Sequence, residues 1–296
     1  MPASGLFFAD HALSARLEAA EAGQLEGLTR VVAERLPERG AAFLSLAGGC
    51  AAFLGPNVSV SRAAGLGMSG PVTPADLDAL EALYRSRGAE ARILVSPFAH
   101  PSLFEQLGDR RFRLVELDTI LARLISGVDS GVERSPAPAG ALEVSATGMM
   151  DVRNTGEMNV RRAEVEEAAA WVEVSLRGFS GSDEPPPRDL AALFEVAFHV
   201  PSVFYFFARI GGAAAGTAGL RIHGSTAHFF ATSTQPAARG RGVQAALIDH
   251  RLEVARARGC DLAFAATEAG SASQRNFERR GFRPVYSRAL MTKRYD

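Results

Sequence analysis

Cysteine is scarce in this sequence. Cys50 and Cys260 are the only two, and they lie in opposite halves of a chain of 296 residues. A secreted disulfide scaffold carries more cysteines at closer spacing. Two distant thiols also cannot build a metal site at ligand spacing. We therefore expect no disulfide framework and no metal, as in a protein of a reducing compartment such as the cytoplasm.

The chain also lacks a long apolar run and an excess of charge of either sign. No apolar segment approaches the roughly 20 residues that a membrane helix needs, and residues 1–5 show no basic stretch ahead of an apolar one. The net charge is −1, which gives no electrostatic reason to expect nucleic acid or an anionic membrane as a partner. We expect a soluble protein and leave a homodimer open.

Length and composition favour two domains. Hydrophobic residues make up 47% of the chain, enough for proper cores, and 296 residues suit two domains better than one. Residues 126–140 are rich in Gly, Ser and Pro and have no periodic apolar face, which is typical of a linker. We predict a first domain at 1–127, a linker at 128–141 and a second domain at 142–296.

Hydrophobic spacing predicts the elements of the first half. Thr73 is a plausible N-cap, because Pro74 follows it at the first helical position and Gly88 can end the helix. Periodicity and turn residues give the remaining elements. These are helices at 11–22 and 25–36, a hairpin at 40–54, a helix at 73–87, a strand at 91–95, a helix at 101–107 and a strand at 112–124.

The second half alternates strands and helices in the order β-α-α-β-β-β-α-β-α-β, which predicts an α/β fold with one mixed sheet covered by helices. Residues 103–115 and 274–285 also echo each other, as a short helix, an Arg-rich turn and a last strand, which indicates a duplicated fold. The predicted elements are strands at 142–146, 203–210, 214–222, 226–234, 262–266 and 283–292, and helices at 164–176, 189–198, 243–258 and 273–280.

The segment at 236–244 carries the clearest chemical signal. A strand ends at Pro236, a basic glycine-rich loop follows, and an amphipathic helix begins at Val243. A helix N-terminus attracts phosphate through its unsatisfied N–H groups and its dipole. Gly240 and Gly242 let the backbone approach an anion closely, and Arg239 and Arg241 add charge. A plain turn between strand and helix is the alternative.

This loop resembles the acyl-CoA pyrophosphate loop of the GNAT acyltransferase superfamily, whose pattern is Arg/Gln-x-x-Gly-x-Gly/Ala. Arg239 and Gly242 match the pattern, and Gln244 stands where Gly or Ala is usual. Residues 273–282 are similar to the family's fourth motif, a short helix that leads into Gly-Phe and the last strand. The resemblance implies a mixed-sheet GNAT domain at 142–296 and a degenerate GNAT-like domain at 1–127.

The resemblance also implies the cofactor site. Acetyl-CoA would be the cosubstrate, and a primary amine of a small molecule would be the acceptor that attacks it directly. In the family the sheet opens at this strand, so the backbone there would pair with the pantetheine arm, N–H groups of the loop would hold the pyrophosphate, and an Asn would be a side-chain ligand. The residues concerned are Thr232, Ser233, Thr234, Arg239, Gly240, Arg241, Gly242, Val243, Gln244 and Asn276.

The first half has no such loop. The corresponding stretch, 69–74, contains no basic residue, and its prolines remove N–H donors. We therefore expect this half to have lost acyl-CoA binding and to serve structure or substrate recognition.

The acid and base depart from the family pattern. Phe277 occupies the position where many family members have a Tyr that acts as the general acid. Tyr286 on the last strand is the candidate to replace it. The alternative is that Tyr286 only packs in the core. Phe229 and Phe230 stand where the family often has a Glu that acts as the general base. His228 shares a strand face with Thr232 and could accept the proton directly or through water. A core histidine is the alternative.

Two further hypotheses remain open. A non-catalytic acyl-CoA-binding or sensor module is favoured by Phe277 and the apolar base position. A nucleotide-binding protein is disfavoured, because the loop lacks the Gly-Lys-Ser/Thr of a P-loop.

Overall fold

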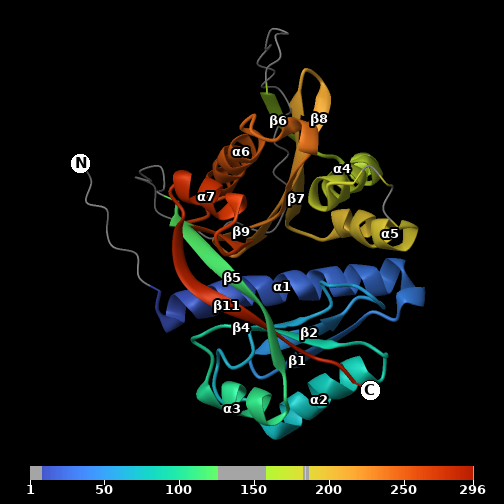
Figure 1. Ribbon diagram of the computed structural model, residues 1–296, viewed down its shortest axis with the longest axis vertical. Coiled ribbons are helices and arrows are strands. Elements are labelled where there is room, and N and C mark those ends of the chain that lie inside the picture. Colours follow the sequence, from blue (N-terminus) through green and yellow to red (C-terminus); the bar gives the residue numbers. More distant parts are fainter. Residues whose placement is uncertain (1–8, 126–157, 183, 185–186, 296) are drawn as a thin grey trace, which may run out of the picture.

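The computed structural model describes residues 9–125, 158–182, 184 and 187–295 (Figure 1). The predicted linker at 128–141 and the predicted strand at 142–146 lie outside these residues, so the predicted domain bounds stay predictions. The first half carries β1 (Ala42–Leu46), β2 (Gly49–Phe53), β3 (Ala63–Ala64), β4 (Ala91–Val95) and β5 (Arg113–Leu124), with helices α1 (His11–Arg35), α2 (Pro74–Arg85) and α3 (Pro101–Asp109).

The second half begins, among the described residues, with a strand at 158–162 that was not predicted, and its later elements follow the predicted order. Its strands are β6 (Met158–Arg162), β7 (Val203–Ile210), β8 (Ala213–His223), β9 (Thr226–Thr234), β10 (Leu262–Glu268) and β11 (Arg283–Lys293). Its helices are α4 (Ala168–Ser180), α5 (Arg188–Val196), α6 (Val243–Ala257) and α7 (Ala272–Arg279).

All these strands form one sheet with the order β1-β2-β3-β4-β11-β5-β10-β9-β8-β7-β6. The predicted α/β fold, a mixed sheet flanked by helices, is confirmed. Figure 1 shows α1, in blue, crossing the middle of the molecule, with α4 and α5 above it and α2 and α3 at the opposite end. Alternation of side chains along the strands places α1, α4 and α5 on one face of the sheet and α2, α3, α6 and α7 on the other.

The two halves exchange their last strands. β5 pairs with β10 of the second half, and β11 pairs with β4 of the first half, while β5 and β11 pair with each other at the centre. The segments that echo each other in the sequence are α3–β5 and α7–β11, which occupy equivalent positions in the two halves. One continuous sheet therefore joins the halves.

α1 is a single helix of 25 residues, and the prediction of two helices was wrong. Gly23, between the two predicted helices, and Gly27 lie where α1 approaches the side chains of His223 and Arg221. A Cβ at Gly23 would be 3.1 Å from His223 Nδ1. Tertiary packing therefore favours glycine within this helix and overrides its low helix propensity.

Candidate functional site

β9 and β10 separate partway along their length. They pair in parallel from Thr226 to Phe229 on β9, and the pairing ends at Phe229 opposite Ala265. Just beyond this point Ala231 has a φ of 46°, and the register of β9 against β8 shifts between Gly219 and Thr217. This is a β-bulge, which bends the strand and turns it away from its neighbour. The edge of β9 that would face β10 is left free beyond Phe229.

The N-terminus of α6 lies next to this opening. Gly242 is the N-cap residue with a φ of 80° and has no side chain to cap the helix. Among the described residues, no carbonyl accepts a hydrogen bond from the N–H groups of Gly240, Gly242, Val243 or Gln244. Such a group of free donors, added to the helix dipole, is suited to a phosphate.

The α2 N-terminus of the first half is built differently. Thr73 caps it, and Asp76 returns the hydrogen bond to the Thr73 N–H at 2.8 Å. Pro74 supplies no N–H donor, and the Asp76 carboxylate would repel a phosphate. Although β3 and β4 run parallel with α2 between them, as β9 and β10 do with α6, this end of the first half offers no anion site.

The predicted cofactor residues lie together around the opening. Ser233 is buried, and its hydroxyl shares a hydrogen bond of 2.8 Å with the Thr217 hydroxyl. Gln244 bonds Asn276 and Ser273, each at 2.8 Å, and so ties α6 to α7. The other predicted residues, Thr232, Thr234, Arg239, Gly240, Arg241, Gly242 and Val243, belong to the end of β9 and to the loop before α6.

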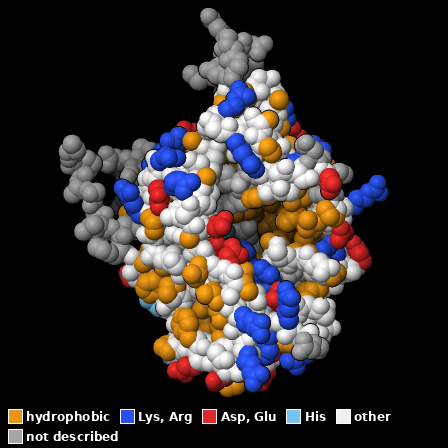
Figure 2. Space-filling view, viewed as in Figure 1, with side chains coloured by type: hydrophobic (Ala, Val, Ile, Leu, Met, Phe, Trp, Pro, Cys, Tyr) orange, Lys and Arg blue, Asp and Glu red, His pale blue; other side chains and the backbone are white. Residues whose placement is uncertain are grey.

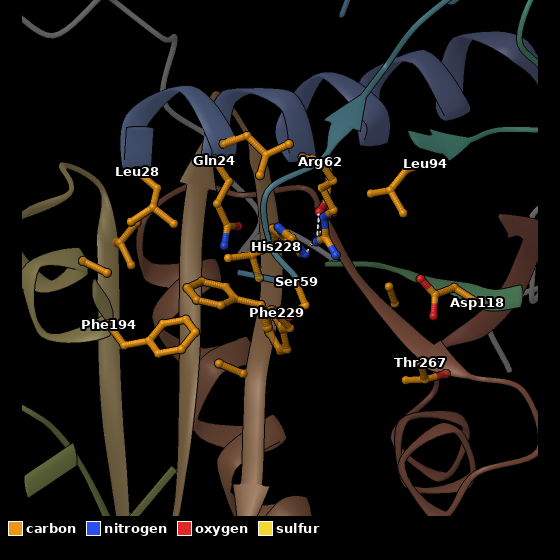
Figure 3. Close-up of a pocket in the computed structure, with 18 of the residues that line it drawn as sticks. Gln24, Leu28, Ser59, Arg62, Leu94, Asp118, Phe194, His228, Phe229 and Thr267 are labelled. Carbon is orange, nitrogen blue, oxygen red and sulfur yellow. Dashed lines mark hydrogen bonds and ion pairs between the residues drawn. The ribbon is translucent and has the colours of Figure 1, made fainter. Parts of the chain in front are cut away.

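A cavity of 520 Å³ opens at the separation of β9 and β10. Figure 3 shows α1 above it, with Gln24 and Leu28 pointing down, and His228 and Phe229 on β9 below. Phe230 and Ala231 of β9 and Ala266 of β10 belong to its wall. Figure 2 shows a hollow in the middle of this face, with hydrophobic side chains gathered on one side of it and acidic ones on the other.

A buried charge cluster lies between α1 and the sheet. Arg288 of β11 lies 3.6 Å from Glu18 and 3.5 Å from Glu21 of α1, and 3.7 Å from Asp118 of β5. Arg62 donates to Glu21 at 2.6 Å. Burial alone would raise the pKa of Glu21, but Arg288 and Arg62 outweigh it and hold that pKa well below its usual range.

His228 lies at the edge of this cluster. Its ring is buried, stacks on Phe264 with centroids 4.3 Å apart, and places Nε2 3.6 Å from Glu21. Burial lowers the pKa of His228 to about 4, against the opposing effect of Glu21. Its Nδ1 has no hydrogen-bond partner among the described residues. The structure therefore holds a neutral imidazole beside a carboxylate, at the wall of the cavity.

Tyr286 is placed differently from the sequence prediction of an acid at the site. It does not line the cavity, and its hydroxyl donates to Glu18 at 2.8 Å. Burial, together with the charge of Glu18, raises the pKa of Tyr286. Phe277, at the family's acid position, is buried against Phe282.

Comparison with known proteins gives a family match within the second half. A family model described as the Acetyltransferase (GNAT) family matches residues 168–282. These residues form a GNAT domain. No curated protein matches the chain.

Solved structures are similar to this chain to different degrees, and the first of the following shares its fold over nearly the whole length. A GCN5-related N-acetyltransferase from Kribbella flavida has a TM-score of 0.58 at 18% identity, with 96% of each chain covered. A putative acetyltransferase of the GNAT family from Novosphingobium aromaticivorans has a TM-score of 0.47 at 19% identity, covering 76% of this chain and 83% of its own. A tandem GNAT protein from the clavulanic acid biosynthesis pathway has 0.49 at 15%, covering 83% and 73%.

Several residues around the GNAT domain were not singled out in the sequence. Glu18 and Glu21 come from α1, Arg62 from the segment before β3, and Asp118 from β5, all in the first half. A helical signal existed for the two glutamates, since they share a buried face with Leu17 and Leu25. Asp118 carried no local signal, because only the pairing of β5 with β10 brings it to the cavity.

In the ranges that the structure describes, no helix combines the length and hydrophobicity of a membrane span. Within the same ranges, no group of three or more His, Cys, Asp or Glu side chains could hold a metal ion.

Proposed function

We propose that this chain is an N-acetyltransferase that transfers an acetyl group from acetyl-CoA to a primary amine of a small molecule. The observation that carries the proposal is the α6 N-terminus, whose free N–H groups lie beside the opening between β9 and β10. Membership of residues 168–282 in the GNAT family supports the same chemistry.

The residues present fit acetyl-CoA. The free N–H groups of Gly240, Gly242, Val243 and Gln244 would hold the pyrophosphate, and the side chains of Arg239 and Arg241 would add charge. The free edge of β9 beyond Phe229 would pair with the amide groups of the pantetheine arm. When bound, acetyl-CoA supplies a thioester carbonyl that an amine can attack. This chain would position that carbonyl at the cavity and exclude water from it.

The attacking amine must lose a proton, and we propose His228 as its acceptor, directly or through water. The Glu21 carboxylate faces Nε2, which leaves Nδ1 as the free acceptor atom. With a pKa of about 4 the imidazole is a weak base, so Glu21 would have to stabilise the imidazolium as it forms. Tyr286 as the acid stays a prediction, which its contact with Glu18 outside the cavity does not support.

Binding of acetyl-CoA tests the proposal, by calorimetry on the wild type and on Gly242→Asp. We expect the substitution to weaken binding at least about tenfold, because a carboxylate would lie among the phosphate donors. Gly259→Asp is the matched control. Gly259 follows the other end of α6, has a φ of 75° against 80° at Gly242, and a Cβ would meet no atom within 4 Å at either position.

An equal loss of acetyl-CoA affinity in Gly242→Asp and Gly259→Asp would show that backbone strain, and not lost phosphate binding, weakens both variants. Unchanged affinity of Gly242→Asp for acetyl-CoA would show that the cofactor does not bind at this loop.

A non-catalytic acyl-CoA-binding or sensor module is the second candidate. Phe277 cannot donate a proton, and Tyr286 lies outside the cavity. Tyr205 lines the cavity, but its buried hydroxyl donates to the Ala197 carbonyl at 3.3 Å. Tight acetyl-CoA binding without release of free thiol across a panel of amines would favour this candidate.

A further inference from the structure

The cavity has two chemically different sides. Large apolar side chains form the side toward α4, α5 and β7, on one flank of the opening between β9 and β10. The opposite flank, on β5 and β10, carries an acidic rim, which we define as Glu116, Asp118 and Glu268. The apolar side consists of Leu28, Trp171, Phe194, Val200, Val203, Tyr205 and Phe230.

The acidic rim is poor in neutralising cations. Glu116 and Glu268 are exposed and form no ion pair among the described residues, and Asp118 approaches Arg288 only to 3.7 Å. Asp118 and Glu268 lie directly opposite each other on β5 and β10. Like charges in such a cross-strand pair destabilise a sheet. A cation bound between them would remove this repulsion.

The charges that line the whole cavity also favour a cation. The lining holds four carboxylates, Glu21, Glu116, Asp118 and Glu268, against three guanidinium groups, Arg62, Arg92 and Arg288. Carboxylates outside the lining also take part of this positive charge. Glu18 lies 3.6 Å from Arg288, and Glu90 lies 3.3 Å from Arg92. The cavity is therefore anionic and attracts cations.

Six polar atoms of residues that line the cavity are buried without a hydrogen-bond partner among the described residues, which indicates a polar ligand at this place. They are the three acceptor atoms Gln24 Oε1, Thr267 Oγ1 and His228 Nδ1 and the Nε atoms of Arg62, Arg92 and Arg288. Thr267 is 6% exposed, lies beside Glu268 at the end of β10, and its Oγ1 has no hydrogen-bond partner among the described residues. His228 is 4% exposed, and its Nδ1 is likewise without a partner there. Buried polar groups are nearly always hydrogen-bonded. Unpaired ones in a cavity wall therefore indicate that a bound ligand supplies their partners.

We propose that the acceptor is a dication: an amine with an apolar or aromatic body and a second ammonium group. This inference rests on the proposed function, and it adds the substrate class. The body contacts the side of Trp171 and Phe194, the reacting amine lies at the opening near Ala231 and Ala266, and the second ammonium binds the acidic rim. Because Asp118 and Glu116 belong to β5, the first half supplies part of the acceptor site.

Calorimetry on the full chain with CoA present tests this proposal. The probes are para-xylylenediamine and para-methylbenzylamine, which share one aromatic body and differ by the second ammonium. We expect the diamine to bind up to about fivefold more tightly than the monoamine, as an ion pair at an exposed rim allows. In Glu116→Gln/Glu268→Gln this ratio should fall to near one, with the monoamine unaffected. Both residues are exposed, so the double variant should fold.

Glu105→Gln is the matched control, since Glu105 is exposed on α3, on the opposite face of the sheet. It should keep the wild-type ratio. A ratio near one in the wild type, or a ratio that survives in the double variant, would overturn the proposal. Loss of the proposed function would show separately, as no binding of acetyl-CoA by the same protein.

Discussion

His228 lies at the meeting point of the two halves, on β9 of the GNAT domain and 3.6 Å from Glu21 of the first half. Its ring stacks on Phe264 and is closed off from solvent, which disfavours the imidazolium. The same burial that makes it a weak base also makes the folded protein sensitive to acid. A stability measurement can therefore probe the environment of this residue without any substrate.

We expect the free energy of unfolding to fall as the pH is lowered from 6.5 to 4. The pKa of His228 is about 4 in the folded protein and about 6.5 when unfolded, so the unfolded chain takes up the proton first. The loss should reach about 3 kcal/mol at most over this window. Urea denaturation at several pH values measures it. His228→Phe should remove most of this dependence, whereas His11→Gln, an exposed control, should keep it. An unchanged dependence in His228→Phe would assign it to other groups.

The site depends on the N-terminus of α6 and on the bulge in β9. α6 begins at a glycine with uncapped N–H groups, whereas α2 begins at Thr73 with a closed capping box. β9 carries the bulge at Ala231, a non-glycine residue in the left-handed region, which costs about 1–2 kcal/mol. The bulge turns β9 away from β10 where the proposed pantetheine site begins. Local strain in β9 is thus associated with the opening of the sheet.

Ala231→Gly should stabilise the protein by about 1 kcal/mol, because glycine adopts a φ of 46° without the Cβ penalty. The matched control is Ala227→Gly, at a fully buried and regularly paired position of the same strand, which should lose about 1 kcal/mol. Urea denaturation measures both. A loss in Ala231→Gly equal to that of Ala227→Gly would show that the bulge is unstrained.

At the scale of the whole molecule, exchange of the last strands ties the halves into one sheet. β5 lies between β11 and β10, and β11 lies between β4 and β5. Neither half can therefore unfold or separate without breaking these central strand pairings. α1 adds to this, because it contacts strands of both halves. We therefore expect the two halves to unfold as one cooperative unit.

The single tryptophan, Trp171 in α4, reports on this cooperativity. Leu77→Ala empties a fully buried position in α2, in the core of the first half, and should cost about 2–5 kcal/mol. We expect the Trp171 fluorescence transition in urea to shift by the same amount as the circular dichroism transition. A Trp171 midpoint equal to that of the wild type would show that the halves unfold independently.

The sequence by itself determined the elements whose signals are local. The cap at Thr73, the loop at 239–242 and the periodic face of α6 depend on neighbouring residues, and the helices and strands they predict are present. The family was likewise indicated by two short motifs. The roles of the loop residues, Asn276, His228 and Tyr286 stay predictions.

Only the tertiary structure decided how the halves are joined and what lines the cavity. Helix α1 runs through Gly23 because packing against β8 favours it there. Asp118 reaches the cavity through the pairing of β5 with β10, more than a hundred residues along the chain, and Arg288 reaches Glu21 in a similar way. Such contacts depend on which strands become neighbours, and local spacing does not encode that choice.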